Sequence, residues 1–385
     1  MNRKRRLLIQ RYLNDSTIQR ITQITMSILE HRKAIDSLDE KIVHLLNERT
    51  GHVLEIGAIK MRAGEEIYAP HREASVLRRL CRKNKGPITN ESLLAIYREV
   101  MSSALSLEKS MTISYLGPEA TFTHQAAIRR FGSSLRYTAT KTIPDVFTEV
   151  SRNRADYGVV PIENSTEGVV THTLDMFVES DLKIVAQIVL PIQYCLVANC
   201  QLAAVERLYG HPQALGQCRG WIQKQLPKAE IIETSSNARS AELVAQAGKS
   251  KKKTLSVAAI TGVLAAQKYD VDIVATDIQD LTTNATRFLV LGRQCSPATG
   301  RDRTSLMLSI ADKVGSLYQS LGPFRKYRLN MTRIESRPSR RKAWEYFFFV
   351  DCDGHMTDSK VANAIKNLGE VCNFVKVLGS YPNAE

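Results

Sequence analysis

The sequence predicts a multidomain chain: an all-α N-terminal domain, a two-lobed α/β middle domain and an α+β C-terminal domain. Its 385 residues are too many for one ordinary hydrophobic core. The apolar pattern also changes twice, near residue 113 and again near residue 303. We place the boundaries at 1–21 for a basic N-terminal extension, then 22–109, 112–293 and 303–382.

Residues 22–109 are predicted to be helical throughout. Apolar residues recur mostly at three- and four-residue spacing from Ile35 to Ile59, which predicts one long helix. The stretch "MRAGEEIYAP" interrupts it. A second helix is expected from about His71 to Lys83, and a third that ends near Lys109.

The middle segment alternates short β-rich runs with helical stretches, which is typical of an α/β domain. The runs are "ISYLG", "YGVVPI", "KIVAQIVLPIQYCLVA", "LSVAAI", "DIVATDI" and "RFLVLGR". A second lobe is predicted from Asn199 onward, because the chain enters it after one strand run and returns around residues 260–290. Residues 304–378 then give strand, helix, strand, strand, helix, strand, which is the ferredoxin-like order.

The formal net charge of +14 is concentrated in three segments, 1–20, 249–253 and 325–342. A nucleic-acid binder needs its basic groups on one surface, with aromatic side chains if the target is single-stranded. Solvated loops and a tail explain the clusters more simply, so we expect no nucleic-acid partner. A salt-dependent shift on generic DNA would be needed to support one.

The sequence lacks several features that would indicate other classes of protein. Seven scattered cysteines without a CxxC pair fit a reducing, cytoplasmic location. No histidine forms a spaced ligand pair, and no dinucleotide fingerprint occurs, so we expect no metal and no cofactor. No apolar run is long enough to cross a bilayer, and the N-terminus lacks the apolar core of a secretory signal.

Two cations lie in the apolar stripe of the long helix. Arg49 is seven residues from both Ile42 and Ile56, and Lys60 lies roughly 20° around the helix and ~16 Å along it. Both could bind one small anion. Arg32 is about 25 Å from Arg49 along the same axis, so it could join that site only from a second chain. The alternative is that these side chains snorkel or pair with acids.

Further charges occur on inward faces of the other two helices. Arg72 and Glu73 begin the second helix, and Glu108 follows Val100 and Ala104 in four-residue steps along the third. Together with the cations of the long helix, these residues predict a buried, highly polar pocket.

The helical segment resembles the AroQ-type chorismate mutase domain, an intertwined all-helical dimer, in "HRKAIDSLDEKIVHLLNER", "EIGAIK" and "RE". A Claisen rearrangement of a dianion needs conformational restraint and stabilisation of the developing charge, with no nucleophile. Ala69 stands where the family usually has aspartate, and Ala104 where some members have serine. The resemblance implies that Lys60 and Glu108 are catalytic, and that the substrate-binding set is Arg32 (from a second copy), Arg49, Lys60, Arg72, Glu73 and Glu108.

Three hydroxyl-rich stretches border predicted strands of the middle segment: "YLGPEATFTHQAA", "PIENSTEGVV" and "NATRFLVLG". Ordinary helix capping could explain any one of them. Three in one α/β domain predict a ligand cleft at the strand termini.

These motifs, with "YGHPQALGQC" and "TSSNARSAELVA", resemble prephenate dehydratase, a two-lobed, periplasmic-binding-protein-like family that binds prephenate between its lobes. The resemblance implies that Thr286 is catalytic and that Arg287 meets a carboxylate bidentately. Ala120 replaces a family glycine, and a positive φ there would strain the loop by about 1 kcal/mol. The implied substrate-binding residues are Thr121, Glu163, Asn164, Ser165, Thr166, Thr286, Arg287 and Phe288.

The C-terminal stretches "DKVGSLYQSL" and "TRIESRP" resemble the ACT domain that follows these dehydratases and binds phenylalanine at a dimer interface. A plain dimerisation domain is the alternative, because the fold alone names no ligand. The implied effector residues are Gly315, Ser316, Leu317, Glu335, Ser336, Arg337 and Pro338.

Together the resemblances imply a homo-oligomeric enzyme, a dimer or larger, of the bifunctional chorismate mutase and prephenate dehydratase family. It would convert chorismate through prephenate to phenylpyruvate, under feedback inhibition by L-phenylalanine. The rival interpretation is a catalytically impaired amino-acid sensor with the same domains. Ala69 and Ala120 support that rival, whereas the intact motifs around Arg49, Asn164 and Thr286 oppose it.

Overall fold

The computed structural model describes residues 15–249, 256–338 and 346–383, with side chains from residue 25 onward. The basic run at 250–253 and most of the predicted N-terminal extension lie outside these residues. The chain divides into two compact units, one ending at Glu65 and the other beginning at Glu66.

The first unit contains one long helix, α2 (Asp15–Ala63), as the apolar spacing predicts. Ile35, Leu38, Ile42 and Leu45 are each more than half exposed in the single chain. A helix normally buries its apolar stripe against another element. The apolar side chains of α2 therefore remain available to a partner.

The second unit opens with the other two predicted helices, α3 (Pro70–Lys83) and α4 (Asn90–Glu108). Thr89 caps the start of α4, because its hydroxyl accepts the Ser92 N–H at 3.1 Å and satisfies one free donor of the first turn. Pro70 in the first turn of α3 favours the helix start for a different reason: it has no N–H that would be left without a partner.

The first α/β lobe is built on a sheet of order β2-β1-β3-β11-β5, with β4 paired to β3. The strands β1 and β2 run parallel to their neighbours, whereas β11 is antiparallel to both β3 and β5. The elements are β1 (Thr112–Leu116), α5 (Phe122–Phe131), β2 (Arg136–Thr140), α6 (Ile143–Ser151), β3 (Tyr157–Asn164), β4 (Gly168–Val169), α7 (Thr171–Phe177), β5 (Lys183–Pro191) and β11 (Ala285–Gly292).

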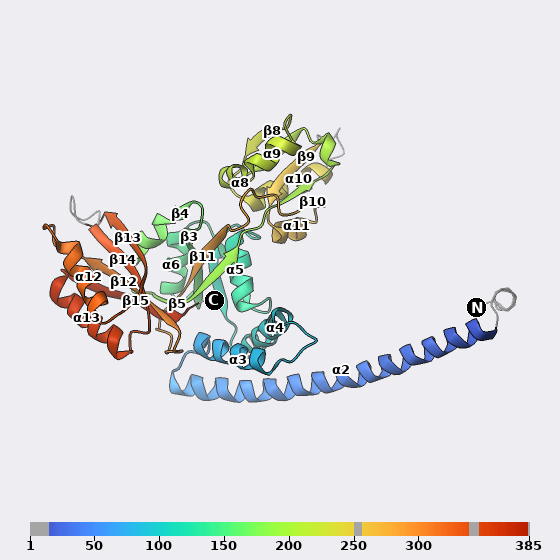
Figure 1. Ribbon diagram of the computed structural model, residues 1–385, viewed down its shortest axis with the longest axis horizontal. Helices are drawn as coiled ribbons and strands as arrows, with labels where there is room; N and C mark the ends of the chain where they lie inside the picture. Colours follow the sequence, from blue (N-terminus) through green and yellow to red (C-terminus); the bar gives the residue numbers. More distant parts are fainter. Residues whose placement is uncertain (1–14, 250–255, 339–345, 384–385) are drawn as a thin grey trace. The chain divides into compact units, whose positions relative to one another are not determined.

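The second lobe lies between β5 and β11 along the chain, as predicted, on a sheet of order β10-β6-β9-β7-β8 (Figure 1). It begins at Cys195, because the run predicted as continuous is divided after Pro191 into β5 and β6. Its elements are β6 (Cys195–Ala198), η1 (Leu202–Ala204), β7 (Arg207–Gly210), α8 (Pro212–Gln217), α9 (Arg219–Gln225), β8 (Glu230–Glu233), α10 (Asn237–Lys249), β9 (Val257–Thr261), α11 (Val263–Tyr269) and β10 (Ile273–Ala275).

The C-terminal domain has the predicted βαββαβ order, with strands arranged β13-β14-β12-β15. It packs against the first α/β lobe: a Cβ added at Gly379 of β15 would lie 2.2 Å from the Ile184 carbonyl oxygen of β5. The two domains also share one core, since Phe177 and Leu289 cluster with Phe349. The elements are β12 (Asp302–Ser309), α12 (Ser316–Lys326), β13 (Met331–Pro338), β14 (Tyr346–Asp353), α13 (Ser359–Val371) and β15 (Phe374–Pro382).

Candidate functional sites

Two of the predicted motifs lie side by side at the ends of β3 and β11. Asn164 is paired with Thr286, and Glu163 with Arg287. Successive side chains of a strand point to opposite faces of the sheet. The Asn164–Thr286 pair and the Glu163–Arg287 pair therefore face opposite sides.

Asn164 organises the first of these faces. Its side-chain Nδ2 donates to Thr286 Oγ1 at 2.8 Å and to Asn284 Oδ1 at 2.9 Å. Its Oδ1 accepts the backbone N–H groups of Thr166 at 3.0 Å and Glu167 at 3.1 Å. The polar run at the end of β3 is thus held by one buried amide, which fixes the turn through local side-chain-to-backbone bonds.

Gln217 of α8 joins this cluster from the second lobe. Its Nε2 donates to Thr166 Oγ1 at 2.8 Å, and its Oε1 accepts from Asn284 Nδ2 at 2.7 Å. Gln217 and Asn284 lie in the stretches "YGHPQALGQC" and "NATRFLVLG", but neither residue was among the predicted site residues. The pairing of these two side chains across 67 residues is visible only in the fold.

Thr121 is the N-cap of α5, with its hydroxyl accepting from the His124 N–H at 3.4 Å. Ala120 has φ 65°, which confirms the left-handed backbone suspected at this departure from the family motif. His124 Nδ1 accepts the Ala120 N–H at 3.1 Å. Burial lowers the pKa of His124, so the ring is held neutral as an acceptor. No sequence motif indicated this role of His124.

Arg287 and Phe288 follow Thr286 on β11. The Arg287 guanidinium contacts the C-terminal domain, with Nη1 2.8 Å from Asp351 and Nη2 donating to Tyr381 at 3.0 Å. Burial alone would lower the pKa of Arg287, but Tyr381, Asp351 and Glu163 raise it. Phe288 is 1% exposed and belongs to the hydrophobic core. Arg287 faces away from Thr286, whereas Phe288, two residues further along β11, shares the face of Thr286. The contacts of both residues with substrate stay predictions.

The mutase candidates are distributed over both units. Arg32, Arg49 and Lys60 lie on α2, and one guanidinium nitrogen of Arg49 is buried without a hydrogen-bond partner among the described residues. Arg72 is exposed on α3. Glu108 is the half-buried last residue of α4.

Glu73 has a partner that the sequence did not suggest. Its carboxylate lies 2.9 Å from Arg130 of α5, whose Nε donates to Tyr68 at 2.7 Å. Burial raises the pKa of Glu73 against the opposing effect of Arg130. Glu73 thus joins α3 to the α/β lobe, a structural role that competes with its predicted role in substrate binding.

The predicted effector residues lie on α12 and β13. Gly315 precedes α12 with φ 85°, a left-handed conformation that glycine adopts without strain. Ser316 and Leu317 open that helix. Arg337 makes two bonds to the Asp175 carboxylate of α7, at 3.2 and 3.3 Å. Glu335, Ser336 and Pro338 complete the end of β13.

Neither a metal site nor a membrane crossing is evident in the described ranges. Among the residues the structure describes, no group of three or more His, Cys, Asp or Glu side chains is placed to hold a metal ion. Over the same part of the chain, no helix combines the length and apolar character that a bilayer crossing requires.

Comparison with known families matches all three segments. The chorismate mutase type II family matches residues 31–109, the prephenate dehydratase family matches 113–296, and the ACT domain matches 304–370. A bifunctional chorismate mutase/prephenate dehydratase of Aquifex aeolicus is 47% identical over 360 residues, covering 92% of this chain and 98% of that protein. This chain belongs to the bifunctional chorismate mutase/prephenate dehydratase family.

Other family members and solved structures agree with this assignment. The Neisseria gonorrhoeae member is 44% identical, covering 93% of this chain and 97% of its own length. A crystal structure of prephenate dehydratase in complex with L-Phe from Arthrobacter aurescens matches with a TM-score of 0.66 and 34% identity, over 71% of this chain and 90% of that one. A structure described as GqqA, a novel type of quorum quenching acylase, matches with a TM-score of 0.63 and 26% identity, over 71% and 98%.

Proposed function

We propose that this chain rearranges chorismate to prephenate and then dehydrates and decarboxylates prephenate to phenylpyruvate. The observation that carries the proposal is the polar cluster of Asn164, Thr286, Asn284 and Gln217, in which the two lobes meet. The cluster presents amides and hydroxyls, in keeping with a reaction that needs oriented hydrogen bonds.

Thr286 is proposed to donate to the ring hydroxyl that leaves prephenate. Because Asn164 already donates to Thr286 Oγ1, the proton of that hydroxyl remains available for an acceptor on the ligand. Loss of CO2 drives out the ring hydroxyl, so the departing oxygen benefits from such a donor. Thr121, Ser165 and Thr166 are proposed to contact the same substrate.

The mutase site is proposed to form between two copies of the chain. Arg49, Lys60, Arg72 and Glu108 would bind the dianion, joined by Arg32 of the second copy. The exposed apolar face of α2 supports an intertwined homodimer, because pairing would bury it. A positioned donor or cation at the ether oxygen would stabilise the charge that develops as the C–O bond breaks.

L-Phenylalanine is proposed as the allosteric effector, bound by the ACT domain near Gly315 and Glu335. The complex of the related dehydratase with L-Phe supports this choice of ligand. We place the enzyme in the cytoplasm, in keeping with its seven free cysteines. A dimer or larger homo-oligomer follows from the proposed sharing of sites.

The fold alone does not decide the chemistry, since a protein with a similar fold is described as an acylase. A catalytically impaired sensor also remains the rival interpretation. The presence of the complete helical segment, matched to chorismate mutase type II, favours the bifunctional enzyme over both.

Incubation of the purified chain with chorismate tests the proposal. Phenylpyruvate should accumulate, which requires both activities. In the Thr286→Ala variant the reaction should stop at prephenate, because dehydratase kcat should be lower by roughly 10²–10⁴-fold. Arg49→Ala should leave chorismate unchanged yet still convert added prephenate. If the parent chain yields prephenate only, it lacks the dehydratase activity, and if it yields neither product the sensor is favoured.

A further inference from the structure

Four charged side chains meet between the dehydratase sheet and the ACT sheet. Each sheet supplies one arginine and one carboxylate. Arg287 and Glu163 are cross-strand partners on β11 and β3. Arg333 and Asp351 are cross-strand partners on β13 and β14. These four residues are called the quartet below.

The ion pairs of the quartet cross from one domain to the other. Arg287 Nη1 lies 2.8 Å from Asp351, and Arg333 Nε lies 3.4 Å from Glu163. Both arginine side chains are 12% exposed, and Asp351 is 6% exposed. Glu163 is 38% exposed, so the Arg287–Asp351 pair is the one largely removed from solvent. Salt screens that pair little, and it constrains the two sheets more than a surface pair would.

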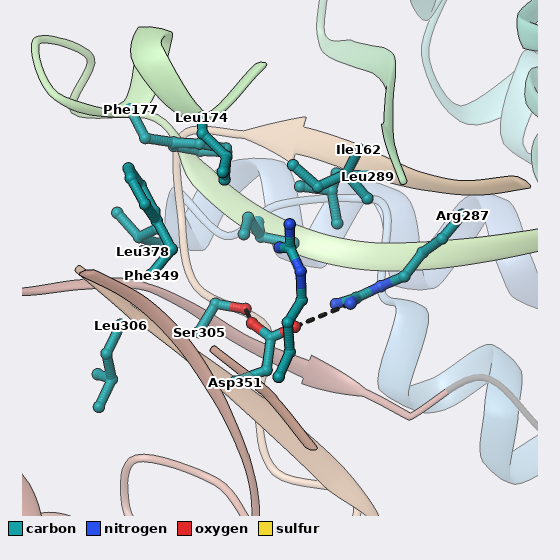
Figure 2. A pocket seen from close by; sticks show the side chains of 12 residues that line it. Ile162, Leu174, Phe177, Arg287, Leu289, Ser305, Leu306, Phe349, Asp351 and Leu378 are labelled. Carbon is teal, nitrogen blue, oxygen red and sulfur yellow. Dashed lines mark hydrogen bonds and ion pairs between the residues drawn. The ribbon is translucent and has the colours of Figure 1, made fainter. Parts of the chain in front are cut away.

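Asp351 is itself held in place within the ACT domain. Ser305 Oγ donates to Asp351 Oδ1 at 2.5 Å, and Ser305 Oγ lies 2.7 Å from the Tyr381 hydroxyl. The same Tyr381 hydroxyl accepts from Arg287, so the contacts close into a ring. Figure 2 shows Ser305 and Arg287 on either side of the Asp351 carboxylate, beside apolar side chains of both domains.

The dehydratase half of the quartet is one residue away from Thr286 and its hydrogen-bond partner Asn164. Arg287 follows Thr286 on β11, and Glu163 precedes Asn164 on β3. Adjacent residues of a strand share one stretch of backbone and point to opposite faces. A side chain anchored on one face therefore restrains its neighbour on the other face. Any shift of Arg287 or Glu163 would therefore change the 2.8 Å contact between Asn164 and Thr286.

We propose that Asp351 and Arg333 of the ACT domain are positioning residues for the dehydratase reaction, acting through Arg287 and Glu163 on Thr286 and Asn164. This inference rests on the proposed dehydratase function. It gives Arg287 and Glu163 a role that fits their places, since both face the ACT domain.

Steady-state kinetics of the full chain with prephenate test the inference. Asp351→Asn keeps the shape of the side chain but removes the charge that anchors Arg287. We expect dehydratase kcat to fall by about tenfold with KM changed less than about twofold, as for a misplaced catalytic group. Asp351→Glu should recover most of the loss. Arg333→Met should act in the same direction, and the double variant should fall no further than the worse single variant, because both act on one contact.

Asp353→Asn is the matched control, two residues along β14, where the carboxylate accepts from Asn330 instead. It should keep parental kinetics. Parental kcat in Asp351→Asn, an equal fall in Asp353→Asn, a loss confined to KM, or additive losses in the double variant would each overturn the inference. If Asp351→Asn fails to fold, Ser305→Ala decides, since it removes only the donor that orients Asp351: a smaller fall in kcat supports the inference and parental kcat overturns it. Absence of prephenate turnover in the parent would instead refute the proposed function.

Discussion

Helix α2 and strand β11 differ in the exposure of their apolar side chains. Ile59 of α2 is 61% exposed in the single chain, whereas Leu289, Val290 and Leu291 of β11 are at most 2% exposed. The cationic residues of α2 therefore lie on an element that needs a partner, and Thr286 lies on an element completed by its own chain. The difference predicts that one activity depends on a second copy and the other does not.

Subunit mixing gives the largest expected effect of this difference. Arg32→Ala and Arg49→Ala should each abolish mutase activity. In a mixed dimer, one of the two sites would receive intact Arg32 from one copy and intact Arg49 from the other. With random exchange, about a quarter of the parental mutase activity should return, because half of the dimers are mixed.

The dehydratase supplies the contrasting control. Thr286→Ala and Gln217→Ala lie in one intrachain cluster, so mixing these two variants should restore no dehydratase activity. Verified subunit exchange without recovery of mutase activity would refute a shared mutase site. Recovery of dehydratase activity would show that the cluster is shared after all.

The ion pair that joins the mutase segment to the α/β lobe offers a second test of the comparison. Glu73 was predicted to bind the mutase substrate, yet it pairs with Arg130 of the α/β lobe at 2.9 Å, with the two side chains 15% and 22% exposed. Removing one partner of a buried pair leaves the other charge uncompensated. Glu73→Ala should lower the free energy of unfolding of the second unit by about 3 to 5 kcal/mol, measured by chemical denaturation.

Glu91→Ala is the control for that loss, since Glu91 lies exposed in the first turn of α4. It should change stability by less than about 1 kcal/mol. If Glu73→Ala keeps parental stability but raises the mutase KM, the predicted substrate role is correct and the structural role is wrong.

The sequence predicted the elements well where their signal is local. Periodicity placed α2, α3 and α4, and the predicted order of strands and helices along the ACT domain was correct. The strands β2, β4, β7 and β8 were missed. Most residues of β2 and β8 are exposed, and β4 and β7 have only two and four residues, so each leaves little apolar pattern to interpret. The positive φ of Ala120 was anticipated from one substituted motif position.

The site was predicted less completely, and for a physical reason. Motifs identify residues that are close in sequence, such as Thr286 and Arg287, but the strand sends these two side chains to opposite faces. Gln217, Asp351 and Arg130 reach their partners only through tertiary packing. Composition around these residues gave no distinguishing signal.

The smallest expected effect concerns pH and the loop before α5. His124 accepts the Ala120 N–H and stacks on Tyr115 with ring centroids 4.4 Å apart. Burial lowers its pKa in the folded state, with Lys268 adding to the effect and Glu119 opposing it. The unfolded chain, with a histidine pKa of ~6.5, therefore binds this proton more readily than the folded chain. The stability that neutral His124 supplies is complete above that value and is lost as the pH falls through the lower folded pKa.

Denaturation of the parent between neutral and mildly acidic pH should show this loss, accompanied by a decline in dehydratase kcat, because the loop positions Thr121. His124→Phe keeps an aromatic ring on Tyr115 and cannot be protonated, so it should be less stable at neutral pH but should flatten the acid-side slope. His172→Phe, at an exposed position on α7, should retain the parental slope. An equal slope in the parent and in His124→Phe would assign the acid sensitivity to other groups, and the left-handed Ala120 would then be held by its surrounding packing alone.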